Sequence, residues 1–213
     1  MKNNTGLPII LIGGGGHARV LADILLQQDK QIAAVVSPEP LMESPLFDGI
    51  NHLSSDEDVR RYAPDEVLLV NAIGMLPGAD SRKKVCEYFL AQGYTFESVI
   101  APTATVSAYA TIKQGAQIMS GAIIQAGAVI GEQTIVNTQA VIEHDCQIGS
   151  RNHIAPGSTV CGEVTTGNDV FVGAGATIIN GMTIGSNAII GAGTCITRAV
   201  EDGKTVRRQQ KNL

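Results

Sequence analysis

The fold is decided by residues 135–160, which read IVNTQAVIEHDCQIGSRNHIAPGSTV. The aliphatic residues of this stretch recur at every sixth position, at Val136, Ile142, Ile148, Ile154 and Val160. The same spacing runs from Ile100 to Ile196, and Thr166 is the one position where it fails. Because a helix repeats about every 3.6 residues and a strand about every 2, this longer period predicts a solenoid of short strands.

Two further positions of each repeat fit the solenoid. The fourth residue after the aliphatic is small or apolar, as at Ala104, Ala110, Ala116, Ala122, Ala128, Ala140, Cys146, Ser158, Ala176 and Ala188. The third is glycine or a residue that tolerates positive φ, as at Gly115, Gly121, Gly127, Gly157, Gly175, Gly181, Gly193, Asp145, Asp169 and Asn187. The first set predicts a second inward side chain on each strand, and the second predicts the corners.

Three hexads make one triangular coil, so residues 18 apart in the sequence lie one above another at about 4.8 Å. No insertion breaks the repeat between Ile100 and Ile196, and we therefore expect a plain prism without an excursion loop. Only eight charged residues fall between Ala101 and Val200, which predicts that self-association covers much of the prism.

The composition argues against several classes of protein. A net charge of −5 and a pI near 5.3 disfavour a nucleic-acid surface. No apolar stretch has the length of a transmembrane segment or a signal-peptide core, so we expect a cytoplasmic protein. The four scattered cysteines predict reduced thiols rather than disulfides. The repeats hold only His144 and His153, too few for a three-histidine zinc site, and we expect no metal.

The sequence before the repeats predicts a small Rossmann-like α/β domain over residues 1–98, followed by the coil at 99–200 and a tail at 201–213. Strands are expected at 7–12, 32–36 and 66–73, helices at 18–28, 55–62 and 81–92, and an irregular segment at 37–54. Strands that alternate with helices predict a parallel sheet.

The first strand runs into four glycines that match G-x-G-x-x-A at Gly13, Gly15 and Ala18. Such a loop lets backbone N–H groups approach a phosphate at a helix N-terminus, although glycines here could equally serve a tight turn. The second strand ends in Val36-Ser37-Pro38 without an acid to hold a ribose. This disfavours NAD and leaves a smaller nucleotide diphosphate, which His17 could contact, or His17 could simply cap the loop.

The charged interruption Glu143-His144-Asp145 stands out in a nearly neutral solenoid. His144 falls two residues after the inward Ile142 and should project outward at a corner. An unperturbed imidazole is a competent general base near neutral pH. Asp145 occupies the corner position, where Asp also has a backbone reason to occur, and Glu143 could orient the imidazole or raise its basicity.

Two more residues of the repeats are placed by the same period. Gly162 comes 18 residues after His144, one coil above it, and its N–H could stabilise a tetrahedral oxyanion. A corner glycine is the alternative reading. His153 points outward half a coil from His144, so these histidines would share one cleft only if adjacent prisms contribute different faces.

Together these pieces resemble the sugar acyltransferases of the PglD/NeuD group, which are bacillosamine-pathway N-acetyltransferases and sialic-acid O-acetyltransferases. The resemblance covers nearly the whole chain and is carried by residues 13–18, 135–138, 142–146, His153, 156–157 and 161–162. It implies a left-handed parallel β-helix, a homotrimer with acetyl-CoA in a groove between adjacent β-helices, and a nucleotide sugar on the N-terminal domain.

The resemblance also implies roles for single residues. His144 would take a proton from the attacking amine with support from Asp145 or Glu143, and Asn137 would position the sugar. His153 and the Gly162 amide would contact the acetyl thioester. Contacts with the UDP-sugar are implied for Gly13, Gly15, His17, Gly74 and Arg82, and a place along the CoA groove for Gly173, Gly191 and Ala192.

The chain departs from the family pattern in two places. Val36-Ser37 replaces the acids that follow the second strand, which puts the uridine contact in doubt. The usual G-x-P-A-K/R ending is absent, and residues 204–208 read KTVRR instead. Their basic side chains could meet CoA phosphates or belong to a solvated tail, and such a tail would also suit one domain of a longer, PglB-type bifunctional protein.

The predicted function is transfer of acetyl from acetyl-CoA to the 4-amino group of a UDP-linked amino-dideoxy sugar of the bacillosamine pathway. The residues themselves do not distinguish an amine from a hydroxyl acceptor, so O-acetylation of sialic acid or another sugar is the alternative. A covalent relay through Cys161 is a variant of the mechanism. A non-catalytic trimeric scaffold is the alternative from another class.

Overall fold

A computed structural model describes residues 6–41 and 43–207 of the chain. Contacts divide it into two compact units, of which the first ends at Pro102 and the second begins at Thr103. No helix in the described ranges has the length and apolar character needed to cross a membrane.

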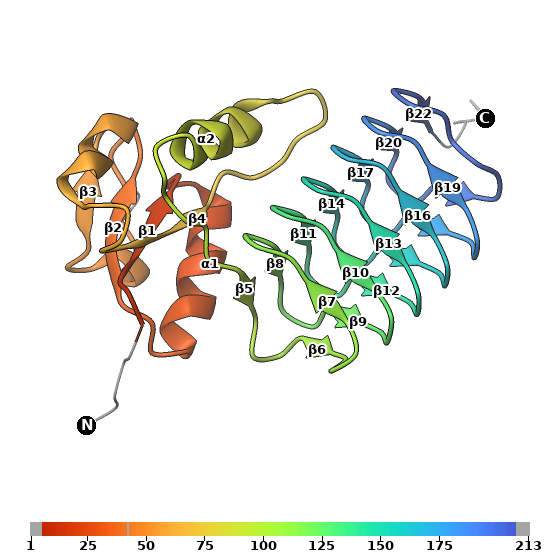
Figure 1. Cartoon of the computed structure of the whole chain (residues 1–213), viewed down its shortest axis with the longest axis horizontal. Coiled ribbons are helices and arrows are strands. Elements are labelled where there is room, and N and C mark those ends of the chain that lie inside the picture. The colour runs from red at the N-terminus through yellow and green to blue at the C-terminus, as the bar shows by residue number, and fades with distance from the viewer. Residues whose placement is uncertain (1–5, 42, 208–213) are drawn as a thin grey trace. The chain divides into compact units, whose positions relative to one another are not determined.

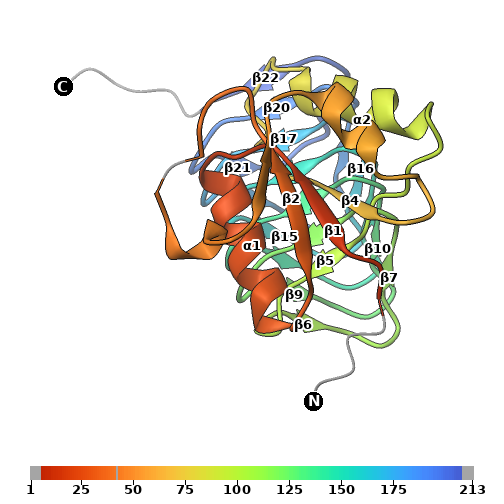
Figure 2. The ribbon, with the colours of Figure 1, turned by 90° about the vertical axis from the view of Figure 1, so that its left-hand side faces the viewer.

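The first unit is built on a parallel four-stranded sheet. Its elements are β1 (Ile9–Ile12), α1 (Gly16–Gln27), β2 (Ile32–Val36), η1 (Pro45–Phe47), β3 (Asn51–Leu53), η2 (Asp56–Arg61), β4 (Leu68–Asn71) and α2 (Ser81–Leu90). The strand order is β3-β2-β1-β4, and α1 and α2 cover opposite sides of the sheet (Figures 1 and 2). Every residue of β1 is buried, as expected for a central strand covered on both faces.

One local prediction for this unit was wrong, and the helix predicted at 55–62 is confirmed as a short 3₁₀ helix. Strand β3 lies in the segment predicted to be irregular, where it pairs in parallel with β2 and places Val36 opposite Leu53. Its sequence, Asn-His-Leu, carries no β-branched or aromatic signal, so tertiary pairing decided its conformation. The acidic helix is a 3₁₀ helix that starts with a capping box between Ser55 and Asp58.

The second half of the chain winds into a parallel β-helix of two-residue strands on three faces (Figure 1). The seven-stranded sheet contains β5 (Val99–Ile100), β8 (Gln117–Ile118), β11 (Ile135–Val136), β14 (His153–Ile154), β17 (Phe171–Val172), β20 (Ile189–Ile190) and β22 (Thr205–Val206). The six-stranded sheet contains β6 (Thr105–Val106), β9 (Ile123–Ile124), β12 (Val141–Ile142), β15 (Thr159–Val160), β18 (Thr177–Ile178) and β21 (Cys195–Ile196). The five-stranded sheet contains β7 (Thr111–Ile112), β10 (Val129–Ile130), β13 (Gln147–Ile148), β16 (Thr165–Thr166) and β19 (Thr183–Ile184).

Strand register confirms the predicted 18-residue coil, since Val136 pairs with Ile154 and Ile142 with Val160. From Ala116 onward the inward aliphatic residues and the small apolar residues four positions later form one buried core. Val106 and Ile112 are only partly buried against it, and Ile100, the first residue of the predicted series, is exposed. The corner positions have positive φ as predicted, and the set extends to Gln133, Gln139, Arg151 and Glu163. The six-residue period therefore predicted which side chains point inward and which residues form the turns between strands.

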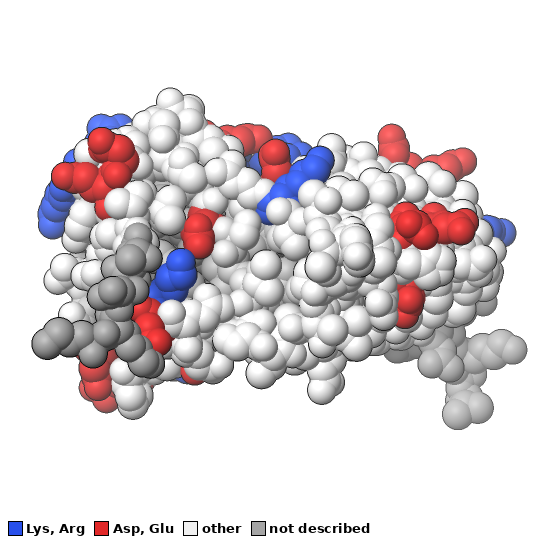
Figure 3. Space-filling model, turned by 60° about the horizontal axis from the view of Figure 1, so that its bottom comes forward, with Lys and Arg blue, Asp and Glu red and all other residues white. Residues whose placement is uncertain are grey.

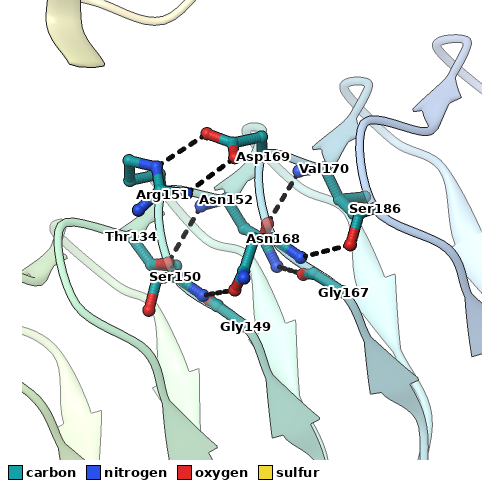
Figure 4. A network of polar contacts seen from close by, with 10 residues as sticks. All are labelled: Thr134, Gly149, Ser150, Arg151, Asn152, Gly167, Asn168, Asp169, Val170 and Ser186. Atoms are coloured by element: carbon teal, nitrogen blue, oxygen red, sulfur yellow. Dashed lines mark hydrogen bonds and ion pairs between the residues drawn. The ribbon is translucent and has the colours of Figure 1, made fainter. Parts of the chain in front are cut away.

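The exception at Thr166 has a structural reason, a polar network whose other members Thr134, Asn152 and Val170 are drawn in Figure 4. The Thr166 side chain is buried, and its hydroxyl accepts hydrogen bonds from the Gly149 N–H at 3.0 Å and the Asn152 amide at 2.6 Å. The side-chain oxygen of Asn152 accepts from the Val170 N–H at 2.7 Å, and the Thr134 hydroxyl accepts from the backbone N–H of Asn152 at 3.0 Å. A polar network thus replaces the aliphatic contact at this corner and satisfies its buried groups.

The coil also extends into residues predicted to form a tail. Strand β22 pairs with β20 and places Val206 opposite Ile190, a separation of 16 rather than 18 residues. Val200 bridges to Ile184 with the same shortened separation. The last turn is two residues shorter than the others. Val206 therefore does not fall on the six-residue repeat, and the repeat did not predict the final strand. Arg208 lies outside the described residues.

Candidate active site

His144 is held at the corner that follows β12. Its Nδ1 lies 2.9 Å from Oδ2 of Asp145, which stands at the positive-φ corner position with φ 59°. A carboxylate can only accept, so Nδ1 carries a hydrogen, and in the neutral imidazole Nε2 then holds the lone pair. Both side chains are more than half exposed, at 57% and 64%. The pair presents an oriented basic nitrogen to solvent.

Gly162 provides the space in which that nitrogen lies. A Cβ at Gly162 would stand 2.6 Å from Nε2 and 2.7 Å from Cε1 of His144, closer than ordinary van der Waals contact. Gly162 is not in the left-handed region, so its lack of a side chain serves the imidazole rather than the backbone. One coil below the pair, Gly127 leaves similar space for the Asp145 carboxylate.

The electrostatic surroundings favour the charged form of His144. Its hydrogen bond with Asp145 raises its pKa most, against a smaller opposing effect of desolvation. The negative charges of Asp145, Glu143 and Glu163 raise the pKa further. A raised pKa makes His144 a stronger base, and its neutral form becomes predominant only at a higher pH than for a free imidazole.

Asn137 and His153 form a second group, after β11 and in β14. The Asn137 side-chain oxygen accepts from Thr138 N–H at 2.7 Å, which fixes the amide orientation. Its Nδ2 therefore donates to His153 Nε2 at 3.1 Å, and the His153 hydrogen sits on Nδ1. The His153 ring packs edge-on against Phe171 with centroids 5.1 Å apart. Phe171 was not singled out from the sequence, because it belongs to no chemical motif, and Thr138 entered only as part of the run 135–138, without a role of its own.

The two groups lie at different corners of the coil. Asn137 and His153 belong to the seven-stranded sheet and its turn, whereas His144 and Gly162 follow strands of the six-stranded sheet. The structure therefore joins His144, Asp145 and Gly162, and separately Asn137 and His153, but does not bring all five together within one chain.

The residues predicted to contact CoA lie at the same corner of the triangular coil as Asn137, but on later coils toward the C-terminus. Gly173 follows β17 and Gly191 follows β20, which lie two and three coils after β11 in the same sheet. A Cβ at Gly173 would stand 2.5 Å from the Ala192 N, so glycine permits the coils to stack there. Gly191 borders Arg207, and Ala192 is exposed. The corner forms a strip with little side-chain bulk.

The glycine-loop residues of the first unit meet at the carboxyl ends of β1 and β4. Gly13 has φ 115°, and a Cβ there would stand 3.0 Å from the backbone of Ala72 after β4. Gly15 is the N-cap of α1 with open space around it, and His17 lies in the first turn. A Cβ at Gly74 would lie 3.8 Å from that of His17. Such an edge of a parallel sheet is where α/β folds bind ligands.

Arg82 stabilises the backbone at the carboxyl end of β4, next to the glycine loop. Its guanidinium is buried and donates to the carbonyls of Asn71 at 2.6 Å and Ile73 at 2.7 Å. The Asn71 amide donates back to the Arg82 carbonyl at 2.9 Å. Burial lowers the pKa of Arg82 to about 10. Arg82 thus fixes the loop that carries Gly74, a supporting role that the sequence did not reveal; its predicted contact with a sugar nucleotide stays a prediction.

Comparisons with known proteins define the class. The bacterial transferase hexapeptide model, of six repeats, matches residues 127–162 and 163–198, and the PglD N-terminal domain model matches residues 8–89. A search of curated protein sequences gave no significant match.

Among the described residues, no group of three or more His, Cys, Asp and Glu is placed to hold a metal ion.

Solved structures then identify the family. A histidine-to-asparagine variant of perosamine N-acetyltransferase from Caulobacter crescentus, in complex with CoA and GDP-perosamine, is 31% identical with a TM-score of 0.85, covering 94% of this chain and 93% of its own. The acetyltransferase domain of PglB from Neisseria gonorrhoeae, in complex with acetyl coenzyme A, is 29% identical with a TM-score of 0.85, covering 94% and 96%. WeeI from Acinetobacter baumannii shares the fold at 22% identity, with a TM-score of 0.80 and coverage of 94% and 96%. The chain belongs to the PglD-type hexapeptide-repeat sugar acetyltransferases, and its coil is a left-handed parallel β-helix.

Proposed function

We propose that this protein transfers acetyl from acetyl-CoA to the 4-amino group of a nucleotide-linked amino-dideoxy sugar, with His144 as general base. The observation that carries the proposal is the geometry of His144, whose Nδ1 is bound to Asp145 and whose Nε2 lies over Gly162. The complexes of the two similar structures, one with CoA and an amino sugar and one with acetyl-CoA, support the choice of substrates.

The transfer is direct. Nε2 of His144 takes a proton from the acceptor amine as its nitrogen attacks the thioester carbonyl, and the Gly162 N–H is the proposed donor to the oxyanion. Collapse of the tetrahedral intermediate breaks the C–S bond, and the imidazolium returns the proton to the departing thiolate. The amine proton therefore ends on CoA sulfur, and the products are an amide and CoA.

The N-terminal domain, residues 1–98, is proposed to hold the sugar nucleotide at Gly13, Gly15, His17 and Gly74. A UDP-sugar of the bacillosamine type is the first candidate. The GDP-perosamine bound by the Caulobacter enzyme makes a GDP-linked 4-amino sugar the second. The end of β2, Val36-Ser37, carries no acid that would favour one base over the other.

The separation of the two residue groups supports a homotrimer. His144 stands at one corner of the coil, and Asn137 and His153 stand at another, so a site that uses all three needs two chains. Most of the coil surface in Figure 3 is free of Lys, Arg, Asp and Glu, which suits burial between copies. We propose that CoA lies along the strip at Gly173 and Gly191, in the groove between two neighbouring copies of the chain.

A thiol-release assay tests the proposal. Acetyl-CoA is mixed with a UDP-4-amino-4,6-dideoxy sugar or GDP-perosamine, using wild type beside His144→Ala. We expect CoA release with one amino sugar and a loss of about 10²- to 10⁴-fold in the variant. Sialic acid is tested as a further acceptor, and CoA release with sialic acid alone would show that the enzyme is an O-acetyltransferase. Absence of release with every acceptor, without a thermal shift from acetyl-CoA, would point to a scaffold.

A further inference from the structure

Glu163 occupies the coil above Asp145 at the same corner. It comes 18 residues later, follows β15 as Asp145 follows β12, and has φ 60° beside 59° for Asp145. Its backbone N–H donates to the His144 carbonyl at 3.0 Å. The two carboxylates therefore leave equivalent backbone positions about 4.8 Å apart, on consecutive coils.

Asp145 and Glu163 lie on either side of His144 along the stack of coils, and the backbone of Glu163 is next to the space that Nε2 occupies. Asp145 holds Nδ1, and Nε2 lies over Gly162, the residue that directly precedes Glu163. Glu163 is exposed, so its side chain is free to reach a molecule that approaches Nε2. Its charge, like those of Glu143 and Asp145, acts on His144 and raises the pKa of the imidazole.

The corner therefore presents anionic groups where an acceptor must enter. A primary amine carries a positive charge in its protonated form, whereas a sugar hydroxyl carries none. A carboxylate near Nε2 attracts the ammonium by charge, whereas a hydroxyl can only donate a hydrogen bond to it, so the amine is favoured.

We propose that Glu163 is an acceptor-specificity residue, whose carboxylate binds the amino group of the sugar as its ammonium beside Nε2 of His144. This inference rests on the proposed function and deepens it, because it selects an amine over a hydroxyl. The bound ammonium releases one proton to solvent, and the neutral amine then attacks the thioester. Its second proton passes through His144 to the CoA thiolate, so the overall reaction yields amide, thiol and one proton.

Steady-state kinetics of Glu163→Gln, with Glu132→Gln as the matched control, test the proposal. Glu132 is an exposed acid in a turn after the five-stranded sheet, so its variant loses the same charge at another corner. We expect Glu163→Gln to raise the KM for the amino sugar by roughly two- to five-fold at low salt. High salt should reduce this difference, while the KM for acetyl-CoA stays unchanged.

Two readouts separate this role from a structural one. Glu163→Asp keeps the charge and should retain most of the affinity for the amino sugar. In Glu163→Gln the acid limb of the kcat profile should move to lower pH, because one of the charges that raise the pKa of His144 is gone. An unchanged KM for the amino sugar, or an equal rise in both KM values, would overturn this inference alone. A wild-type protein that acetylates no amine would overturn the proposed function and this inference with it.

Discussion

The most direct test of the site geometry is Gly162→Ala. The new methyl group would stand 2.6 Å from Nε2 of His144, and an ordinary contact begins near 3.4 Å. The imidazole therefore has to retreat by about 0.8 Å or leave its orientation toward the acceptor. Because a displacement of about 1 Å can cost on the order of 100-fold in rate, we expect kcat to fall by roughly that factor.

Stability should not fall with activity in this variant. Gly162 is outside the left-handed region, so alanine brings no backbone strain, and the entropy of the unfolded chain decreases. We expect an unfolding free energy equal to that of wild type or higher by about 0.4–1 kcal/mol. Thermal or chemical denaturation measures this beside the thiol-release assay.

A double-mutant cycle identifies the route of the effect. If the methyl group acts through the imidazole, Gly162→Ala has little further effect on the residual rate of His144→Ala. Full activity in the single variant would refute the steric reasoning. An equal loss of rate in the presence and absence of the imidazole would show that Gly162 acts independently of His144.

Three further substitutions probe the charge and polar networks. Asp145→Asn should lower the pKa of His144 by weakening its main hydrogen bond, which shifts the acid limb of kcat/KM to lower pH; a pH–rate profile measures it. Thr166→Val removes the hydroxyl that accepts from the Gly149 N–H and one of the two acceptors of the Asn152 amide. It should lower the unfolding free energy by about 1–3 kcal/mol, measured in urea titrations. Arg82→Met removes the guanidinium donors of the Asn71 and Ile73 carbonyls and should also lower the unfolding free energy by about 1–3 kcal/mol. Denaturation of the first unit measures this loss.

Each of these predictions has a result that contradicts it. A pH profile that does not move in Asp145→Asn would mean that the carboxylate does not control the base. A valine at position 166 that leaves stability unchanged would show that the network at this corner is replaceable by apolar packing. An Arg82→Met protein of wild-type stability that fails to bind the sugar nucleotide would assign Arg82 to the ligand instead of the loop.

The coil could be predicted from the residues alone. A side chain that points inward must be apolar, and a corner must allow positive φ, so both requirements return with the geometric period and appear in the residues. The same period is sufficient to place Gly162 one coil above His144. The charged run around His144 marked this residue as the candidate base, because charge is rare in the repeats.

The remaining features required the tertiary structure, since they depend on partners that periodicity does not encode. The direction of the His144 ring follows from Asp145 on one side and the missing Cβ of Gly162 on the other. Thr166 is explained by hydrogen bonds to residues of neighbouring strands and turns, and β22 by a turn shortened by two residues. The family resemblance implies a ligand contact for Arg82, and the structure adds that its buried guanidinium donates to two backbone carbonyls. A repeat specifies where each backbone position lies, whereas side-chain hydrogen bonds are chosen by whatever group the fold brings within reach.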